Sequence, residues 1–242
     1  MINISRIKAI SLDLDDTLWP IWPVIEQAEK DLLHWLGQHA PMTAELLASP
    51  AALREIRQHV ADVLLVQQPQ LRHDLGAMRK ESIRLALVRA GDNPLLADPA
   101  YDVFFAARNR VVLYGDALPA LAAMAARYPL VSLSNGNAQL DVIGLAHFFT
   151  ATISAKEFGK SKPDPHIFIA AAGAVDAQPH EVLHIGDDAA LDVVGALNAG
   201  MQAVWLNREE KLWPYEDTKP TLEVGSLADV VALLGSTAHT SV

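Results

Sequence analysis

A chain of 242 residues has room for one large domain, or for a core domain with a smaller inserted one. Its apolar content of 51% allows a buried core, and its net charge of −10 argues against the basic face that nucleic-acid binding needs. Cysteine is absent from the sequence, which excludes disulfides, thiolate zinc sites and thiol nucleophiles.

The N-terminal segment does not have the pattern of a signal peptide. Arg6 and Lys8 interrupt its apolar residues, and no sustained apolar run follows. No stretch of the chain reaches the roughly 18 apolar residues that a membrane-spanning helix needs. We therefore expect a cytoplasmic protein that binds neither membranes nor nucleic acid, and that is a monomer or a weak dimer.

The first predicted element is a buried strand over Ile7–Asp13, which is short, apolar and β-branched. Residues 19–112 then contain no convincing strand, and apolar residues recur there at helical spacing, as at Ile83, Leu87 and Ala90. The helices expected in this part are Val24–Gln38, Ala51–Gln67, Asp74–Ala90 and Pro99–Arg110. We therefore predict an inserted helical domain over residues 19–112.

After Gly115, short apolar segments alternate with helical patterns. The expected strands are Leu130–Leu133, Thr152–Ser154, Val182–Ile185 and Gln202–Leu206, and the expected helices are Ala117–Arg127, Pro165–Gly173 and Ala189–Ala199. Such alternation predicts an α/β fold with a parallel sheet, built from residues 1–18 and 113–242. Asp116 is expected to cap the first of these helices, and Ser236–Val242 to fray.

Four polar motifs follow four of the predicted strands. They are Asp13-Leu-Asp15-Asp16-Thr17, Ser134-Asn135-Gly136, Lys162-Pro163-Asp164-Pro165 and the acidic run Gly186-Asp187-Asp188, with Asp192 shortly after it. Ligands of an open α/β sheet bind beyond the carboxyl ends of the strands. We therefore expect these motifs to converge on one site, although they lie far apart in the sequence.

The motifs supply the groups that phosphoryl transfer to a carboxylate requires. Asp13 is the predicted nucleophile, and Asp15 is the predicted acid that protonates the leaving oxygen and then activates water. Lys162 supplies fixed positive charge for the phosphate oxygens. Ser134 offers a hydroxyl, and Asn135 offers a backbone amide at an expected helix start, where anions are favoured. These five residues are the predicted catalytic and phosphate-binding groups.

A divalent cation is also expected, because a carboxylate and a phosphate repel each other at contact distance. Hard cations such as Mg2+ prefer oxygen ligands. Asp187 is the predicted metal carboxylate. Asp188 or Asp192 is expected to lie next to the metal ligands and hold them in position without binding the metal itself. Thr17 is expected to shape the turn that follows the nucleophile.

At these motifs the chain resembles the haloacid dehalogenase superfamily of phosphohydrolases, and the resemblance extends over nearly the whole sequence. It implies a Rossmann-like core and a helical cap of the family's first type, inserted between the first two motifs. It also implies a role for each motif residue: Asp13 as nucleophile and metal ligand, Asp15 as acid/base and as metal ligand through its carbonyl, Ser134 and Lys162 as phosphate-holding groups, Asp187 as metal ligand and Asp192 as its support. Asp188 departs from the family pattern, in which Ser or Thr is common, and leaves the metal shell open at that position.

Longer strings resemble one branch of this family, the bacterial phosphatases of flavin mononucleotide and riboflavin-pathway phosphates. The strings are Asp13–Trp19 and residues 134–139, 159–163 and 183–188. The expected function is Mg2+-dependent hydrolysis of a small phosphomonoester through an aspartyl-phosphate, with flavin mononucleotide or a ribityl phosphate first among the substrates. The alternatives are a phosphatase of sugar phosphates or phosphoglycolate, a dehalogenase, a phosphonate hydrolase, a mutase, and a non-catalytic phospho-accepting switch module.

Four further residues invite a functional interpretation. His184 lies in an apolar strand and is predicted to be a packed core residue rather than a metal ligand. Trp19 and Trp22 are predicted to pack, with contact to a ring-bearing substrate as the alternative. Arg79 is predicted to be a solvated residue on a helix of the insertion, with a substrate contact as the alternative.

Overall fold

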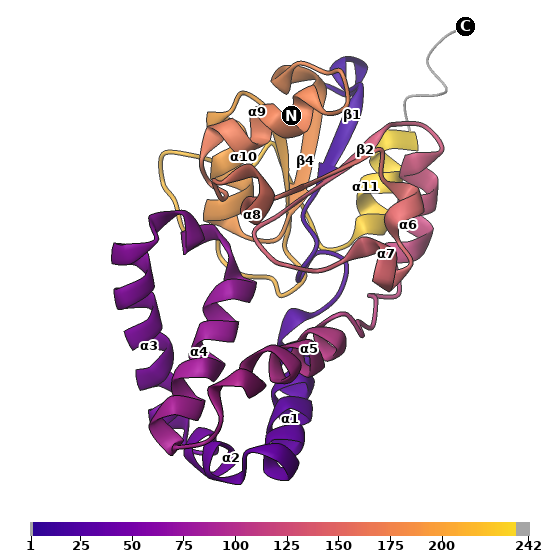
Figure 1. Cartoon of the computed structure of the whole chain (residues 1–242). Helices are drawn as coiled ribbons and strands as arrows, with labels where there is room; N and C mark the ends of the chain where they lie inside the picture. Colours follow the sequence, from indigo (N-terminus) through magenta and orange to yellow (C-terminus); the bar gives the residue numbers. More distant parts are fainter. Residues whose placement is uncertain (1, 236–242) are drawn as a thin grey trace, which may run out of the picture. The chain divides into compact units, whose positions relative to one another are not determined.

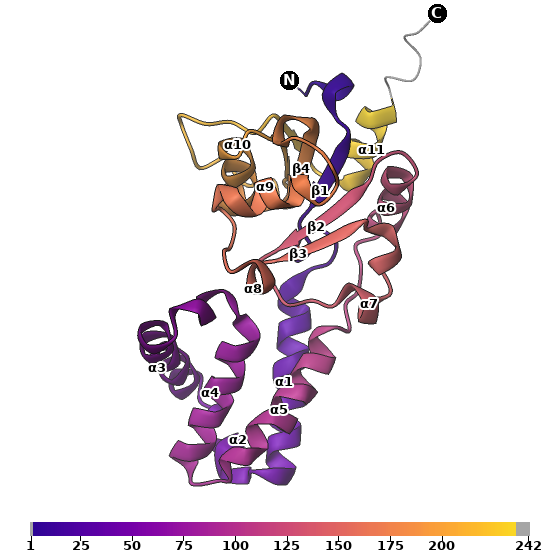
Figure 2. The same cartoon turned by 45° about the horizontal axis from the view of Figure 1, so that its top comes forward.

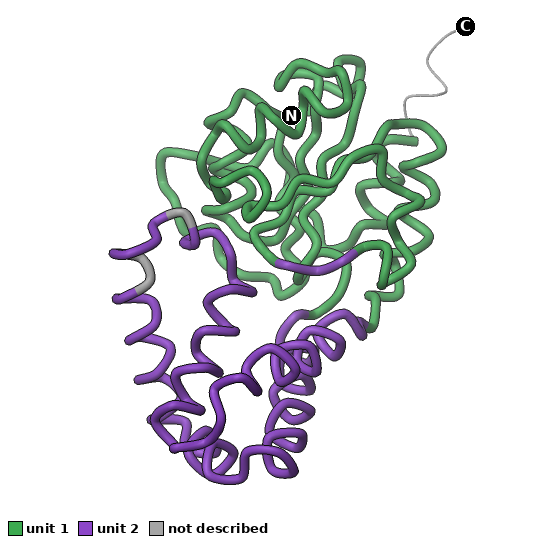
Figure 3. The backbone as a smooth tube through the Cα atoms, in the orientation of Figure 1, with its two compact units in different colours: residues 1–20, 112–136, 140–242 green, residues 21–111, 137–139 purple. Residues whose placement is uncertain are grey.

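The structure is a computed structural model that describes residues 2–235, except for the side chains of Leu64, Leu65 and Gln70. The expected fraying of Ser236–Val242 lies outside the described residues. The chain divides into two compact units (Figure 3). Unit 1 comprises residues 1–20, 112–136 and 140–242, and unit 2 comprises residues 21–111 and 137–139.

Unit 1 is built on a six-stranded parallel sheet with the strand order β3-β2-β1-β4-β5-β6 (Figure 1). The strands are β1 (Ala9–Leu12), β2 (Leu130–Ser134), β3 (Ala151–Ser154), β4 (Val182–Gly186), β5 (Gln202–Leu206) and β6 (Leu222–Val224). The five predicted strands and the α/β fold class are confirmed. Strand β6 was not predicted, because three residues at a sheet edge are too short to give a pattern.

Helices cover both faces of this sheet, as Figures 1 and 2 show. One face carries α9 (Pro165–Gly173) and α10 (Gly195–Asn198), and the other carries α6 (Ala117–Ala125) and α11 (Leu227–Gly235). Two further helices of four residues each, α7 (Leu140–Ile143) and α8 (Ala155–Phe158), lie in connections. Strands β1, β2 and β4 are buried at every position, since a central parallel strand has no solvent face.

The helix predicted over Ala189–Ala199 has a different form in the structure. Residues Ala189–Val194 form a π-helix, and only Gly195–Asn198 are α-helical. The Val193 amide donates to the Asp188 carbonyl, five residues back. A wider turn of this kind changes which direction each side chain takes, and it often marks a functional site.

Asp116 stands at the start of α6 but does not cap it with its side chain. Its carboxylate instead accepts hydrogen bonds from both terminal nitrogens of Arg208, at 3.1 and 3.0 Å, and from the Leu227 amide at 2.7 Å. Asp116 therefore occupies the predicted N-cap position of α6, but its carboxylate forms a bidentate, charge-assisted pair in place of a cap hydrogen bond.

The regular secondary structure of unit 2 is entirely helical among its described residues. Its helices are α1 (Ile21–His39), α2 (Pro41–Leu47), α3 (Pro50–Gln67), α4 (Leu75–Ala90) and α5 (Ala97–Arg108). The four predicted helices are present with shifted ends, and α2 is an addition whose seven residues are too few for a periodic pattern. The buried face of α1, at Ala28, Leu32 and Leu36, packs in one core with Ala100 and Phe104 of α5.

Arg79 on α4 does not lie on a solvated face. Its side chain is 19% exposed, forms an ion pair with Glu29 of α1, and places its guanidinium 4.2 Å from the centre of the Phe104 ring. The prediction of a solvated residue is therefore wrong. The reason is that a guanidinium can pack flat against an aromatic ring while its edge pairs with a carboxylate.

Among the residues described, no helix combines the length and the apolar composition needed to cross a membrane.

Candidate active site

Asp13 and Asp187 follow neighbouring strands at the centre of the sheet. Asp13 comes directly after β1, and its amide donates to the Ile185 carbonyl of β4 at 3.0 Å. Asp187 comes directly after β4, at the same edge. Carboxylate oxygens of Asp13, Asp187 and Asp192 lie within 4.8 Å of one another. Because the chain crosses from one face of the sheet to the other here, loops diverge and leave room for a ligand.

Lys162 joins two of these carboxylates. Its Nζ donates to Asp13 Oδ1 at 2.5 Å and to Asp192 Oδ1 at 2.6 Å, and its side chain is 3% exposed. Burial alone would lower the pKa of this ammonium group, but the charges of Asp13 and Asp192 outweigh burial and raise the pKa above its ordinary value. Lys162 therefore provides a fixed positive charge next to the predicted nucleophile.

Asp192 is positioned by the π-helix and holds Lys162 in place. Its Oδ1 also accepts from His184 Nε2 at 3.2 Å, and its Oδ2 accepts from the Asp188 amide at 3.0 Å. Burial would raise the pKa of Asp192, yet Lys162 and His184 lower it overall. Since three donors already use its oxygens, we infer that Asp192 supports Lys162 rather than binding a cation.

Gly186 makes this arrangement possible. A Cβ atom at position 186 would lie 2.3 Å from the Asp192 Cγ. Any other residue would therefore push the carboxylate away from Lys162. Gly186 stands at the head of the acidic motif, but the motif pattern alone gives no sign that this position must be glycine.

His184 is a core residue, as predicted, but it is also part of the polar network. Its side chain is fully buried, stands edge-on to the Phe168 ring at 5.1 Å, and places Nδ1 3.0 Å from the Ser11 hydroxyl. Burial lowers the pKa of the imidazole. A neutral ring that donates from Nε2 to Asp192 accepts at Nδ1 from Ser11, so the tautomer is set by its neighbours.

The acidic cluster carries more negative charge than Lys162 balances. Burial raises the pKa of Asp13 well above its ordinary value against the effect of Lys162, and the charges of Asp192 and Asp187 raise it further. Burial also raises the pKa of Asp187 to about 7, with contributions from Asp192 and Asp16. A divalent cation between Asp13 and Asp187 would relieve both effects and keep the two carboxylates ionised.

The donor set fits Mg2+. Asp13 and Asp187 offer carboxylate oxygens, which hard cations prefer. Asp187 Oδ1 receives one long hydrogen bond, from Thr17 Oγ1 at 3.4 Å, so its oxygens retain lone pairs for a metal. When bound, the cation would reduce the electrostatic repulsion between the Asp13 carboxylate and the phosphate.

Asp15 lies in a tight loop whose shape is fixed by Trp19. Trp19 Nε1 donates to Asp15 Oδ1 at 2.8 Å, the Asp16 amide donates to the Trp19 carbonyl at 2.7 Å, and Asp16 adopts a left-handed conformation with φ of 58°. Trp19 is fully buried, so the alternative in which its ring contacts a substrate is wrong. Its function in the structure is to orient the Asp15 carboxylate.

Ser134 is the last residue of β2, and its Oγ accepts from the Gly136 amide at 2.9 Å. No helix begins at Asn135, because α7 starts at Leu140, so the predicted helix start is wrong. The Asn135 side chain instead donates to the Lys162 carbonyl at 3.0 Å and accepts from the Lys162 amide at 2.8 Å. This reciprocal pair fixes the loop of Ser134 against that of Lys162, a link that motif spacing does not reveal.

Asp188 and Arg208 are charged residues near the site whose hydrogen bonds stabilise the neighbouring backbone. Asp188 Oδ1 caps the π-helix by accepting from the Ala190 and Leu191 amides, both at 2.8 Å, which accounts for an acid where the family pattern has Ser or Thr. Arg208, which was not predicted, donates to the Thr17 carbonyl at 3.1 Å, and its guanidinium lies 4.1 Å from the centre of the Tyr114 ring. It anchors the loop that carries Asp15, and no motif marks it.

The structure thus brings Asp13, Lys162, Asp187 and Asp192 together, and it places Ser134 at the end of β2 and Asp15 and Thr17 in the loop that follows β1. The catalytic, phosphate-binding and metal-binding roles of these residues remain predictions.

Comparison with known proteins gives consistent matches. A family model described as haloacid dehalogenase-like hydrolase matches residues 7–200. The chain is 32% identical to the 5-amino-6-(5-phospho-D-ribitylamino)uracil phosphatase YigB of Escherichia coli, covering 96% of this chain and 98% of that protein. It is also 32% identical to a phosphoserine phosphatase of Thermus thermophilus, covering 92% and 97%. A solved structure described as a 2-haloacid dehalogenase from Pseudomonas syringae is similar with a TM-score of 0.87, at 33% identity over 96% of this chain and all of that one.

Proposed function

Because this chain belongs to the haloacid dehalogenase-like hydrolases, we propose that it is a Mg2+-dependent phosphomonoester hydrolase that acts through an aspartyl-phosphate. The observation that carries the proposal is the contact of buried Asp13 with Lys162, beside a second carboxylate, Asp187. A carboxylate nucleophile, an adjacent fixed cation and a site for a divalent metal are the groups that this chemistry needs.

In the proposed first step, a carboxylate oxygen of Asp13 forms a bond to phosphorus as the ester P–O bond breaks. Asp15 gives a proton to the leaving oxygen, while Lys162 and the Ser134 hydroxyl hold the phosphate oxygens. In the second step, Asp15 takes a proton from water and the water oxygen attacks phosphorus. The bond to Asp13 breaks, which releases inorganic phosphate and restores the carboxylate.

A carbon–halogen hydrolase is the second candidate, because one similar solved structure is described as a 2-haloacid dehalogenase. The same nucleophile would then attack carbon. Such a reaction releases halide, which needs no proton, and so it gives Asp15 no leaving oxygen to protonate and Asp187 no phosphate charge to offset through a metal. Measuring phosphate release from p-nitrophenyl phosphate and halide release from 2-chloropropanoate separates the two. Halide release without phosphate release would overturn the proposal.

Removing divalent metal should abolish phosphate release. Dialysis against EDTA is expected to leave no measurable rate with p-nitrophenyl phosphate, and Mg2+, but not Na+, should restore it, because Asp13 and the phosphate otherwise repel each other. Without a cation the pKa of Asp187 is about 7, so protons compete with the metal. The Mg2+ concentration for half-maximal rate should therefore rise as the pH falls below about 7. Full activity after metal removal would contradict the proposal.

For the substrate we propose a small ring-bearing phosphomonoester, with a ribityl phosphate or flavin mononucleotide first. The support is the 32% identity to the ribitylaminouracil phosphate phosphatase of Escherichia coli. The chain is equally identical to a phosphoserine phosphatase, so identity alone does not choose between these substrates. Trp22 on α1 is 76% exposed, so the prediction that it packs is wrong, and its indole face is available for stacking.

The test is kcat/KM for flavin mononucleotide, 5-amino-6-(5-phospho-D-ribitylamino)uracil, phosphoserine, phosphoglycolate and sugar phosphates. We expect a ring-bearing substrate to have the highest kcat/KM. Trp22→Ala should lower that kcat/KM by roughly 2- to 12-fold, which corresponds to the free energy of one aromatic contact. Leu95→Ala, which truncates another exposed apolar side chain of unit 2, is the control. A clear preference for phosphoserine or a sugar phosphate, unchanged in Trp22→Ala, would reject this substrate class and leave the phosphatase proposal standing.

A further inference from the structure

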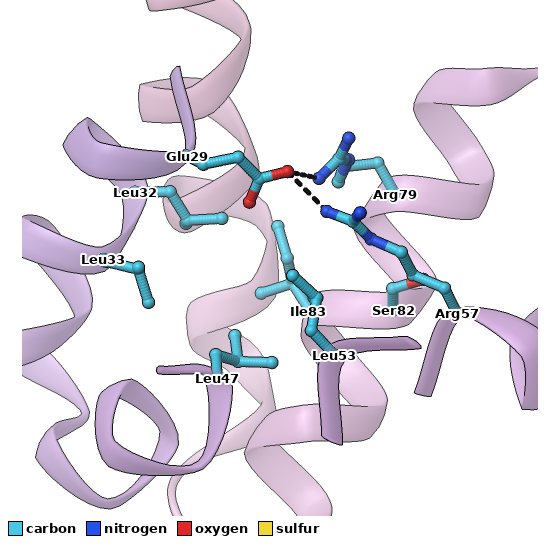
Figure 4. A pocket seen from close by; sticks show the side chains of 9 residues that line it. All are labelled: Glu29, Leu32, Leu33, Leu47, Leu53, Arg57, Arg79, Ser82 and Ile83. Carbon is cyan, nitrogen blue, oxygen red and sulfur yellow. Dashed lines mark hydrogen bonds and ion pairs between the residues drawn. The ribbon is translucent and has the colours of Figure 1, made fainter. Parts of the chain in front are cut away.

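Unit 2 contains a partly open cavity between α1, α2, α3 and α4, with about 480 Å3 of space not filled by atoms when the adjoining solvent is counted (Figure 4). Its apolar lining is aliphatic and consists of Leu32, Leu33, Leu47, Leu53 and Ile83. Its polar lining consists of Glu29, Arg57, Arg79 and Ser82. All of these residues belong to unit 2, so the cavity is defined by one compact unit alone.

The charged groups of the cavity do not balance. One carboxylate oxygen of Glu29 bonds both Arg57 and Arg79, as Figure 4 shows, which leaves one net positive charge. Burial lowers the pKa of the Arg79 guanidinium, Glu29 raises it, and the neighbouring charge of Arg57 lowers it again. Tyr101 is the other titratable group that acts on Arg79.

An excess positive charge next to an aliphatic cavity favours a particular kind of ligand. A partly buried charge without a counter-ion is unfavourable, so an anion at this place is stabilising. A guanidinium carries five N–H donors, and the bonds to Glu29 leave others on both arginines for an anionic group. A small hydrophilic anion would leave the five aliphatic side chains exposed to water, whereas a ligand with an apolar body would cover them.

We propose that this cavity binds an amphipathic monoanion, an organic carboxylate with an aliphatic or aromatic body. The body lies against Leu32, Leu47 and Leu53, and the carboxylate binds Arg57 and Arg79 beside Glu29. A cationic ligand would be repelled by the two guanidinium groups. The cavity shares no lining residue with the acidic cluster of Asp13, Asp187 and Asp192, and the proposal does not depend on the proposed reaction.

The test is calorimetric titration of the full chain with butanoate, hexanoate and octanoate, and with hexan-1-ol as the uncharged counterpart. The affinity should rise by about fourfold per methylene until the cavity is full, which corresponds to roughly 0.8 kcal/mol for each buried CH2. Hexan-1-ol should bind at least about tenfold more weakly than hexanoate, because it lacks the charge-assisted bonds. Absence of saturable binding by all three carboxylates would overturn the proposal, as would equal binding of the acid and the alcohol.

Substitutions in the cavity are expected to change the affinity for octanoate in opposite directions. Arg57→Gln should weaken octanoate binding by about tenfold or more, Leu53→Trp should block it by filling the cavity, and Glu29→Gln should tighten it by removing the competing carboxylate. The matched control is Arg89→Gln, which removes an arginine on α4 that pairs with Glu55 outside the cavity. An equal loss in Arg89→Gln and Arg57→Gln would reject the site.

Binding should persist in Asp13→Asn, because octanoate would not occupy the catalytic site. Loss of octanoate binding in that variant would place the anion at the acidic cluster and its metal, and would overturn the proposal. Circular dichroism of every variant establishes that each one is folded before its affinity is compared.

Discussion

Replacing Asp13 with asparagine should lower the turnover of p-nitrophenyl phosphate by roughly 10⁶-fold, the scale on which a hydrolase loses activity without its nucleophile. The amide oxygen of asparagine is a poor nucleophile, so no acyl phosphate forms. Asparagine fills the same volume and still accepts a hydrogen bond from Lys162, so the site should keep its shape. Initial rates and the protein mass after acid quenching check both statements, since only the wild type should gain a phosphate.

The matched control for this variant is Asp176→Asn. Asp176 is exposed in a turn with φ of 54°, a left-handed conformation that asparagine also adopts readily. Its rate should equal that of the wild type. A near-normal rate in freshly purified Asp13→Asn, or covalent phosphate on another residue, would contradict the assignment of Asp13 as the nucleophile.

The sequence predicted the sheet and the meeting of the motifs because both follow from local patterns. Buried parallel strands such as β1 and β4 are short apolar runs, and their carboxyl ends share one edge. This rule places Asp13 near Asp187 without knowledge of any side-chain conformation. The prediction for these two residues needs nothing more than their position after strands of one parallel sheet, whereas the ligand role of Asp15 came from the family resemblance.

The contacts that orient these groups could not be predicted in the same way. Asp192 reaches Lys162 because a π-helix redirects it and because Gly186 leaves space, and a π-helix has no period that separates it from an α-helix in six residues. Asn135 was interpreted through its backbone, whereas its side chain holds Lys162. Such pairings join loops that are distant in sequence, so they depend on the completed fold.

Trp19 shows how one such contact changes a functional interpretation. A large aromatic residue after a catalytic motif is equally compatible with substrate stacking and with packing. In the structure its indole N–H donates to Asp15, and its ring is fully buried. The same residue is therefore evidence about the orientation of Asp15 and not about the substrate.

Replacing Asp15 with asparagine should slow the hydrolysis of alkyl phosphates by roughly 10²–10⁴-fold, the usual contribution of general acid–base catalysis. The asparagine side-chain oxygen can still accept the hydrogen bond from Trp19 Nε1, so the loop should keep its conformation. What is lost is the proton that an alkoxide needs as it leaves. An aryl oxide leaves without that proton, so the loss in the first step should be much smaller for p-nitrophenyl phosphate.

The comparison between leaving groups distinguishes proton transfer from a structural effect. Asp15→Asn should slow alkyl phosphates far more than aryl phosphates when single-turnover formation of the phosphoenzyme is measured. In Trp19→Phe, Asp15 keeps its carboxylate and loses the hydrogen bond from Trp19, so alkyl phosphates should again lose more rate than aryl phosphates, but by a smaller factor than in Asp15→Asn. Single-turnover measurement is needed because water activation by Asp15 in the second step is common to all substrates. If Asp15→Asn slowed phosphoenzyme formation equally for both classes, Asp15 would not be the acid, and its carboxylate would act only through the loop that it shares with Trp19.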